Sequence, residues 1–370
     1  PFHWFIQFYG ILHGGGFDVI IGNPPYVEIK SVEYVPRGFQ TTPCGDLFAL
    51  CMERSKLLLL RGGRLGMIVP VSIVSADGFS ELRQCLRPPQ ALSWTLNFAE
   101  RPSKLFTGVE KRLTIWLMQL ASGVVGHSHL SNYKRWMAEE RDTLFAKNQF
   151  VTGTATCSLV GDSIPKVSLP VEIRMLERLA SEKPLETYFS RASAHVVYYT
   201  RKLRYFVQFF DFVPLIKDSR GRKIPPTELK EIYLRDAAQS EVVISLLNSS
   251  LFFWFFCSFS DVRNVNKREI NAFPCSLDKM KPEVISKLRK LCNALMKDFD
   301  QNSRVLTSDY GKHGVLHIQS FQPRLSKPIL DEIDTVLAVH YGFTAEELDF
   351  ILNYDIKYRL GRGGIEEEEA

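Results

Sequence analysis

The sequence predicts an α/β fold for the first third of the chain and an α+β domain for the remainder. Two observations indicate this division. Up to about residue 122, short apolar runs typical of buried strands alternate with segments of helical periodicity, which favours a mostly parallel sheet. From about residue 123 the chain becomes rich in Gly, Ser and Thr, and the segments that follow are longer and mainly helical.

The elements of the first part follow one another in a regular order. Residues 17–22 are a largely apolar run of strand length. Residues 46–60 are predicted to be a helix, because apolar side chains recur on related faces and Gly62 and Gly63 follow as a stop signal. The remaining segments are a strand at 65–69, a helix at 77–86 and strands at 92–98 and 113–120. No helix separates the last two strands, so we expect them to pair antiparallel at one edge of the sheet.

The second part begins after a transition that contains no clear element. We place the domain boundaries at residues 1–125 for the first domain, 126–165 for the transition, 166–360 for the second domain and 361–370 for an acidic tail expected to be disordered. Helices are predicted at 171–181, 238–257, 281–298, 328–340 and 345–353. Strand-like pieces lie at 194–200 and 203–210, and the aromatic cluster 252–256 is predicted to be core.

Composition limits the class of protein. Of the 370 residues, 45% are hydrophobic and 24% charged, which is ordinary for a globular protein, and a net charge of +5 is compatible with nucleic acid without requiring it. The seven cysteines are scattered and form no Cys-x-x-Cys pair, which argues for a reducing cytoplasm and against a zinc site or disulfide framework. The most apolar run, 246–259, is too short to span a bilayer, so we expect a cytoplasmic protein without membrane contact.

The most informative segment is Asn23-Pro24-Pro25-Tyr26, directly after the first predicted strand. Proline lacks an N–H, fixes φ and pushes the preceding residue into extended geometry, so this turn cannot be helical. It presents an amide side chain, backbone carbonyls and an aromatic ring. Such groups suit holding a planar amino group by two acceptors while the ring stacks on the base that carries it. This arrangement would allow methylation of an exocyclic nucleobase amine, and the base would have to leave the duplex.

The alternative is a plain strand-terminating turn, since Asn and Pro are common turn residues. From average residue usage, the tetrapeptide arises by chance in roughly one chain in a thousand of this size. Its position immediately after an apolar strand further disfavours chance. We therefore prefer the functional interpretation.

The turn and its surroundings resemble the catalytic domain of N6-adenine DNA methyltransferases of bacterial restriction–modification systems. The resemblance rests on Asn23–Tyr26 and on the segment DLFALCMERSKLLLLRGGRLGMIVP that begins at Asp46, and it covers the chain to about residue 122. It continues more weakly through ISLLNSSLFFWFF and DVRNVNKREI, within 244–270. The resemblance implies the carboxy-terminal part of a Rossmann-like methyltransferase sheet, followed by an α+β domain that recognises the DNA target.

The resemblance also implies roles for individual residues. Asn23 and Pro24 would hold the adenine amino group, with Pro25 fixing the turn, and Tyr26 would stack on the base. Phe106 stands where these enzymes carry a second aromatic that encloses the flipped base, although a core phenylalanine is the alternative. The cofactor would be S-adenosylmethionine, bordered at the start of the predicted helix by Asp46, Leu47 and Phe48.

One part of the family pattern is not found. These enzymes bind the cofactor mainly through a Gly-rich loop and an acidic residue upstream of the catalytic turn, and only 22 residues precede Asn23. We therefore expect a truncated protein, a degraded gene or one half of a split enzyme, whose partner is the amino-terminal part or a complementary subunit. We also expect an exposed apolar sheet edge, and we expect the chain alone neither to bind S-adenosylmethionine tightly nor to methylate DNA.

A basic region lies in the second part of the chain. Between residues 191 and 235 there are ten Lys and Arg against four acidic residues, interleaved with aromatics, which suits contacts to double-stranded DNA. The candidate DNA-binding residues there are Arg201, Lys202, Arg204, Arg220, Arg222 and Lys223, the last three in an expected flexible loop. A second candidate segment contains Arg263, Asn264, Asn266, Lys267 and Arg268, where Asn and Arg suit adenine and guanine edges. The alternatives are a solvated hairpin and a polar loop that caps a helix beginning near Lys267.

By resemblance, the expected function is site-specific DNA adenine-N6 methylation, within a restriction–modification or phage-defence system. Two alternatives stay open. In the first, the chain is a catalytically incompetent DNA-specificity module. In the second, it is a subunit of a split methyltransferase. Methylation of a protein glutamine or of RNA is less favoured, because those enzymes are usually compact and do not need some 200 further residues.

Overall fold

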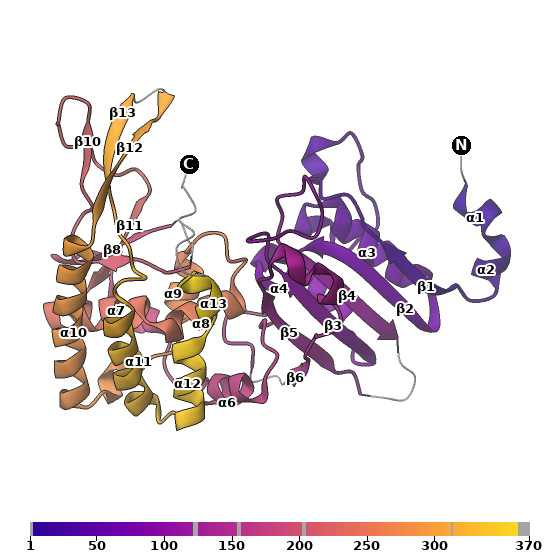
Figure 1. The fold of residues 1–370 in the computed structure, drawn as a ribbon. Helices are drawn as coiled ribbons and strands as arrows, with labels where there is room; N and C mark the ends of the chain where they lie inside the picture. The colour runs from indigo at the N-terminus through magenta and orange to yellow at the C-terminus, as the bar shows by residue number, and fades with distance from the viewer. Residues whose placement is uncertain (1–2, 121–124, 154–156, 202–204, 312–313, 362–370) are drawn as a thin grey trace. The chain divides into compact units, whose positions relative to one another are not determined.

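The structure is a computed structural model that describes residues 3–120, 125–153, 157–201, 205–311 and 314–361 (Figure 1). Its chain divides into two compact units. The first comprises Pro1–Leu176 with Cys257–Asp261, and the second comprises Glu177–Phe256 with Val262–Ala370. The predicted acidic tail 361–370 lies outside the described residues from 362 onward.

The first unit is built on a six-stranded mixed sheet in the order β1-β2-β4-β3-β5-β6. The strands are β1 (Phe17–Gly22), β2 (Leu59–Pro70), β3 (Ala91–Phe98), β4 (Leu113–Leu120), β5 (Ser128–Lys134) and β6 (Val151–Gly153). The pairs β1–β2 and β3–β5 are parallel, whereas β2–β4, β3–β4 and β5–β6 are antiparallel. The sheet is therefore mixed, and the expectation of a mostly parallel sheet was wrong.

The expected antiparallel pair is present, but its position differs from the prediction. Strand β4 pairs with β3 antiparallel as expected, and it also pairs along its other side with β2. It is thus a central strand of the sheet and not an edge. Burial explains this position, because Leu113, Trp116 and Met118 are almost completely enclosed.

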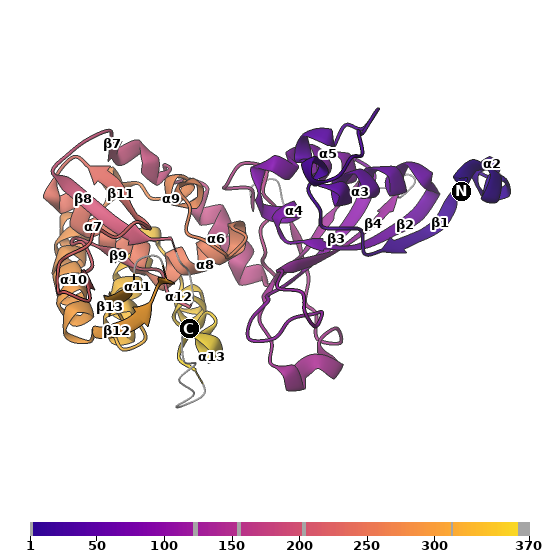
Figure 2. The same cartoon turned by 90° about the horizontal axis from the view of Figure 1, so that it is seen from above.

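Helices α3 (Leu47–Leu58) and α5 (Ser80–Leu86) cover one face of this sheet, together with the short α4 (Ser72–Ser75) (Figure 2). The predicted helix 46–60 is confirmed within two residues. It ends without a glycine, because β2 begins at once at Leu59, and Gly62 and Gly63 lie inside that strand. Two short helices, α1 (Trp4–Gln7) and α2 (Tyr9–His13), precede β1.

The segment 126–165, expected to be a transition, contributes two strands to the sheet. Strand β5 pairs with β3, and β6 pairs with β5. Leu130 and Tyr133 of β5 and Trp136 just after it are buried. Sequence patterning missed this strand because Ser, His and Asn outnumber its apolar residues.

The second unit is mainly helical. Its main helices are α7 (Ala237–Asn248), α8 (Ser250–Phe259), α9 (Lys267–Ala272), α10 (Pro282–Gln301), α11 (Lys327–Tyr341), α12 (Ala345–Asn353) and α13 (Ile356–Arg359), and α6 (Pro170–Leu179) leads into it. The single helix expected at 238–257 is two helices, bent by 63° at Ser249. No single described helix is long and apolar enough to span a membrane; α7 and α8 meet that criterion only when joined across this bend. The side chains of 252–256 are buried, which confirms the predicted core cluster.

Two small antiparallel sheets complete the second unit. One has the order β7-β11-β8-β9, from β7 (Phe189–Ser190), β8 (His195–Thr200), β9 (Phe209–Phe210) and β11 (Leu229–Leu234). The other has the order β10-β13-β12, from β10 (Ile216–Asp218), β12 (Arg304–Asp309) and β13 (Val315–Ser320). Of the strand predicted at 203–210, residues 203 and 204 lie outside the described residues, and the described part forms a strand only as β9. The second sheet was not predicted.

The bend between α7 and α8 is held by a carboxylate from α11. Buried Asp334 accepts hydrogen bonds from the backbone N–H groups of Ser250 and Leu251, both at 3.0 Å. These are donors of the first turn of α8, which have no partner within the helix. Burial raises the pKa of Asp334 to about 6, although the two N–H donors and the nearby Arg359 oppose that rise.

This carboxylate gives a pH-dependent stability that can be measured. The folded pKa of about 6 lies above the unfolded value near 3.9, so the stabilisation is fully present below pH 4 and is lost as pH rises through 6. The stability of the wild-type protein relative to Asp334→Asn should therefore be roughly 1 kcal/mol greater at pH 5 than at pH 7.5. Urea unfolding of both proteins at the two pH values tests this, and a difference independent of pH would contradict it.

Candidate active site

The Asn23–Tyr26 turn leaves the end of β1 and is tied to the neighbouring strand. The Tyr26 hydroxyl lies within hydrogen-bonding distance of two acceptors, the Asn23 Oδ1 at 2.6 Å and the carbonyl of Ile68 in β2 at 2.9 Å. Burial raises the pKa of Tyr26 to about 12, so the phenol keeps its proton and stays a donor at neutral pH. One hydroxyl group therefore links the amide side chain, the aromatic ring and the sheet.

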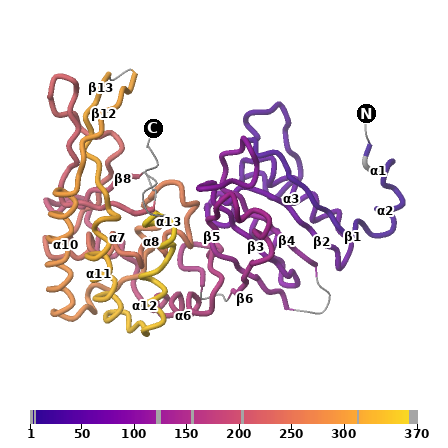
Figure 3. The backbone as a smooth tube through the Cα atoms, in the orientation of Figure 1, coloured from indigo at the N-terminus to yellow at the C-terminus, as the bar shows by residue number. Residues whose placement is uncertain are grey.

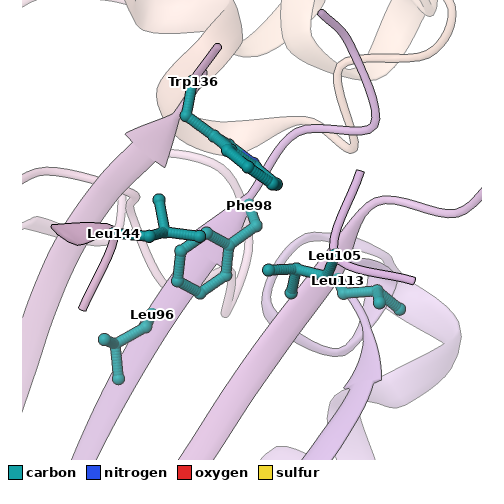
Figure 4. Packing of buried hydrophobic residues seen from close by; sticks show 6 residues of the cluster. All are labelled: Leu96, Phe98, Leu105, Leu113, Trp136 and Leu144. Carbon is teal, nitrogen blue, oxygen red and sulfur yellow. The ribbon is translucent and has the colours of Figure 1, made fainter. Parts of the chain in front are cut away.

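Tyr26 and Phe106 flank one apolar cluster. The cluster consists of Leu96, Phe98, Leu105, Leu113, Trp136 and Leu144 (Figure 4). Half-buried Tyr26 and Phe106 both pack against it, one from the end of β1 and the other from the loop between β3 and β4. The structure thus brings together the two aromatic residues that the sequence placed 80 positions apart.

The segment after the turn is joined to the start of α3 by backbone hydrogen bonds. The N–H of Leu47 donates to the carbonyl of Val27 at 2.9 Å, and the N–H of Ile29 donates to the carbonyl of Gly45 at 2.8 Å. Glu28 and Asp46 form an isolated bridge between the two segments. The predicted cofactor residues and the predicted catalytic turn therefore belong to one small structure.

A cavity of about 610 Å³ lies beside this junction. Its lining includes Glu28, Asp46, Cys44, Ile29 and Lys30. Burial, and then the charge of Glu28, raise the pKa of Asp46. Glu28 forms an ion pair with Lys30 of the same wall at 2.6 Å, so Asp46 is the carboxylate best placed for a hydroxyl or amino group of a ligand.

The three predicted cofactor residues have different environments. Asp46 lines the cavity and Leu47 is half-buried at the first position of α3. Phe48 is only 1% exposed, and its ring packs edge-on against Tyr26 at a centroid distance of 6.5 Å. The ring of Phe48 also packs against that of Phe79, with the ring centroids 5.0 Å apart. Phe48 therefore supports the ring of Tyr26 from within the core.

Glu53 was not singled out from the sequence, yet it organises the loop before α3. Its buried carboxylate accepts hydrogen bonds from the backbone N–H of Gln40 at 3.0 Å and from the N–H and hydroxyl of Thr41 at 2.9 and 2.7 Å. Burial opposes the charge, but these hydrogen bonds, led by that of the Thr41 hydroxyl, lower the pKa of Glu53 overall. The only signal in the sequence is a carboxylate among the apolar residues of a predicted helix.

In the second unit, the structure joins two predicted DNA-binding segments. The side chain of Arg201 donates to Asn266 Oδ1 at 3.3 Å, and the N–H of Val265 donates to the carbonyl of Arg201 at 2.9 Å. Helix α9 begins at Lys267, as expected. Arg263 and Lys267 are exposed, whereas Asn264 and Arg268 are half-buried. Lys202 and Arg204 lie outside the described residues.

The loop containing Arg220, Arg222 and Lys223 is exposed and held rigidly by its own carboxylate. Asp218 Oδ1 accepts from the backbone N–H groups of Arg220 and Arg222, both at 2.9 Å, and Oδ2 accepts from Arg222 Nε at 2.7 Å. The N–H of Arg222 is the leading cause of the lowered pKa of Asp218. Asp218 is thus a residue that sequence patterning missed, although Asp before a Gly-containing turn is a known turn signal.

Among the described residues, no hydrogen bond or ion pair joins the Asp218 loop to Arg201 or Asn266. The described part of the chain also contains no group of three or more His, Cys, Asp or Glu side chains that could hold a metal ion. The predicted DNA-binding residues therefore form two separate groups in the second unit.

Two curated proteins are similar to this chain over part of its length. RM.Eco57I of Escherichia coli, a type II restriction enzyme and methyltransferase, is 28% identical over 138 residues, 34% of this chain and 13% of that protein. RM.MjaORFECS2P of Methanocaldococcus jannaschii, a candidate type II restriction enzyme and methyltransferase, is 42% identical over 87 residues, 23% of this chain and 7% of that protein. The matches thus span about a tenth of each relative.

Solved structures of restriction–modification enzymes are also similar. MmeI, a type IIL enzyme in complex with DNA, gives a TM-score of 0.44 at 12% identity, covering 92% of this chain and 57% of that one. The DrdV–DNA complex gives a TM-score of 0.38 at 10% identity, covering 96% and 56%. Residues 1–106, which include the Asn23–Tyr26 turn, Asp46–Phe48 and Phe106, match the Eco57I restriction-modification methylase family.

Proposed function

We propose that this chain carries the amine-binding half of a DNA adenine-N6 methyltransferase that uses S-adenosylmethionine. The single observation that supports it best is the Asn23–Tyr26 turn, whose amide and ring are tied to β2 by one hydroxyl group. The match of residues 1–106 to a restriction-modification methylase family supports the same reaction class. The target in this proposal is adenine in duplex DNA.

Asn23 has the acceptor capacity that the reaction needs. An amide oxygen carries two lone pairs, and the Tyr26 hydroxyl uses at most one of them. The other would accept one N–H of the adenine amino group, and the carbonyl of Pro24 would accept the second. Two fixed acceptors draw the nitrogen toward tetrahedral geometry, which frees the lone pair that is otherwise delocalised into the ring. No general base is required for this activation.

Tyr26 and Phe106 would hold the base that carries this amino group. An adenine inside a duplex cannot reach the turn, so the proposal requires base flipping. Stacking of a base on an aromatic ring contributes about 1–3 kcal/mol. Both rings pack against one rigid apolar cluster, so they are positioned before the base arrives.

The cavity beside Asp46 fits one part of the cofactor. S-adenosylmethionine supplies an electrophilic methyl group when bound. The carboxylate of Asp46 would accept hydrogen bonds from its hydroxyl or amino groups, beside the ion pair of Glu28 with Lys30. The volume of the cavity, about 610 Å³, is within the usual range for ligand sites.

The topology supports a Rossmann-like origin of the sheet. Strands β1 and β2 are parallel, and the catalytic turn and the Ile68 carbonyl both lie at or near the carboxyl ends of these strands. In open α/β sheets, ligands bind at this edge. Helix α3 connects the two strands, as expected for a βαβ unit.

The second unit would contact duplex DNA. Arg220 and Lys223 are exposed and suited to phosphates, and Arg201 with Asn266 forms a second polar group. We include Arg222, Arg263, Asn264, Lys267 and Arg268 in the same interface. The recognition sequence is not specified by these residues alone.

The amide of Asn23 is the first test of the reaction. In the protein as its gene encodes it, Asn23→Ala should lower the initial rate of methyl transfer to DNA about 100-fold or more, because it removes an acceptor from the developing charge. Incorporation of tritiated methyl groups into DNA, RNA and protein measures this, and we expect label in DNA at N6 of adenine.

DNA binding should survive this substitution, and exposed Asn132 on β5 provides the matched control, since Asn132→Ala should leave the rate unchanged. Methyl transfer that is indifferent to Asn23→Ala would refute the proposed role. Sequence-specific DNA binding without any methyl transfer would instead support a specificity module. Label only in RNA or protein would contradict DNA as the substrate.

The hydroxyl and the ring of Tyr26 should have separable effects. Tyr26→Phe keeps the ring and removes the bonds to Asn23 and Ile68, so kcat should fall roughly fivefold with little change in KM for DNA, as expected for one net hydrogen bond. Tyr26→Ala also removes the stacking surface and should raise KM. Steady-state kinetics of both variants test this. A Tyr26→Phe variant with the wild-type kcat would show that the hydroxyl has no positioning role.

A further inference from the structure

The three strands β10, β12 and β13 form an arm of the second unit that has no assigned role. Figure 3 shows β12 and β13 continuing past the ends of α10 and α11, and Figure 1 shows the loop after β10 beside them. All six residues of β12 are exposed, and Val305 is 68% exposed. A strand that is open on both faces is not explained by packing within its own unit, which suggests contact with a partner.

The register of the arm aligns one apolar row and one polar row on opposite faces, and Val305, Asp309 and Val315 lie on the face of the polar row. Ile216, Leu306 and Ile318 are aligned across the three strands and share one face. Lys217, Thr307 and His317 are aligned in the next row and share the opposite face. The Thr307 hydroxyl and His317 Nδ1 lie 2.9 Å apart. This face therefore presents one row of hydrogen-bonding side chains across the three strands.

One end of the arm carries exposed charges of both signs, Arg220 and Lys223 in the loop after β10 and Asp309 at the end of β12. Asp218 pairs with Leu316 near the end of β13, so the Arg220–Lys223 loop lies next to the turn that connects β12 and β13. The carboxylate of Asp218 is used within this loop, where it binds Arg222. Among the described residues, no acidic side chain pairs with Arg220 or Lys223. These two cations are therefore available to a partner, on a loop whose shape is fixed.

The dimensions of the arm suit a nucleic-acid groove. Adjacent strands lie about 5 Å apart, so the backbones of the three strands span about 10 Å, and the major groove of B-DNA is about 12 Å wide. Phosphates line both sides of that groove, where Arg and Lys bind them, and side chains such as Lys and Thr can bond to base edges within it.

We propose that the β10-β13-β12 arm inserts into a groove of duplex DNA, with Arg220 and Lys223 on phosphates and the row Lys217, Thr307 and His317 facing base edges. The proposal rests on the proposed DNA substrate. It adds β12 and β13 to the DNA interface, although no residue of these strands was among the DNA-binding residues predicted from the sequence. Arg222 acts differently from its neighbours, because it holds the loop through Asp218.

The test is the salt dependence of DNA binding by the full chain. Binding to a mixed-sequence 30-base-pair duplex is measured by fluorescence anisotropy between 50 and 200 mM salt. The affinity of the wild type should fall steeply over this range. In the double variant Arg220→Ala, Lys223→Ala, which lacks two phosphate contacts, the fall in affinity should be about tenfold smaller. The matched control is Lys287→Ala, Lys290→Ala, which removes two exposed charges from α10 and should keep the wild-type dependence.

The polar row is tested by selection of duplexes from a randomised library, followed by sequencing. The double variant Thr307→Val, His317→Ala should lose a preference of about tenfold at one or more base pairs while its affinity for the mixed duplex changes less than threefold. Circular dichroism of each variant establishes that it is folded.

The outcomes separate the arm from the function on which it rests. If the wild-type chain binds duplex DNA and both arm variants behave as it does, the proposed insertion of the arm into DNA is refuted. The proposed methyltransferase function is then unaffected. If the wild-type chain binds no duplex at any salt concentration tested, both the proposed DNA substrate and the proposed DNA contact of the arm are contradicted. Tighter binding of single-stranded RNA than of duplex DNA, lost in the arm variants, would overturn the assignment to a duplex groove.

Discussion

The hydroxyl group of Tyr26 is the interaction on which the candidate active site depends. Two prolines stiffen the backbone of the turn, but they do not orient its side chains. That orientation comes from the hydroxyl, which contacts Asn23 and the Ile68 carbonyl together. Phe48 then supports the same ring from below. A short turn at the end of a strand thereby acquires the rigidity that preorganised catalysis requires.

The elements that the sequence predicted well are those whose signal is local. The bounds of β1, β4 and α12 match the predicted ranges, because each has its own apolar period and clear end signals. The break between α7 and α8 was missed although Asn248, Ser249 and Ser250 interrupt the apolar run, because the capping carboxylate lies far away in the sequence, on α11. The three-residue strand β10 was missed for a similar reason, because its partner lies about 100 residues away.

The candidate site divides in the same way. Asn23–Tyr26 was recognised because its chemistry is contained in four consecutive residues, whereas the packing of Phe106 on the same cluster as Tyr26 requires the fold. Glu53 and Asp218 were missed because their partners are mainly backbone N–H groups of nearby loops, which the fold has to bring to them. Each uses a carboxylate to fix a loop beside a proposed ligand site. Glu53 and Asp218 therefore stabilise these loops and are not proposed to contact the cofactor or DNA.

The position of β1 has a consequence for the dynamics of the site. This strand pairs only with β2 among the described strands, and Val19 and Ile21 are 53% and 79% exposed. Edge strands open at a lower free energy than central ones, so amide exchange in β1 should be faster than in β4. Because the catalytic turn continues directly from β1, fraying of that strand would release Asn23. Any polypeptide that pairs as a strand with the free side of β1 would therefore restrict the motion of Asn23 without contacting the candidate active site.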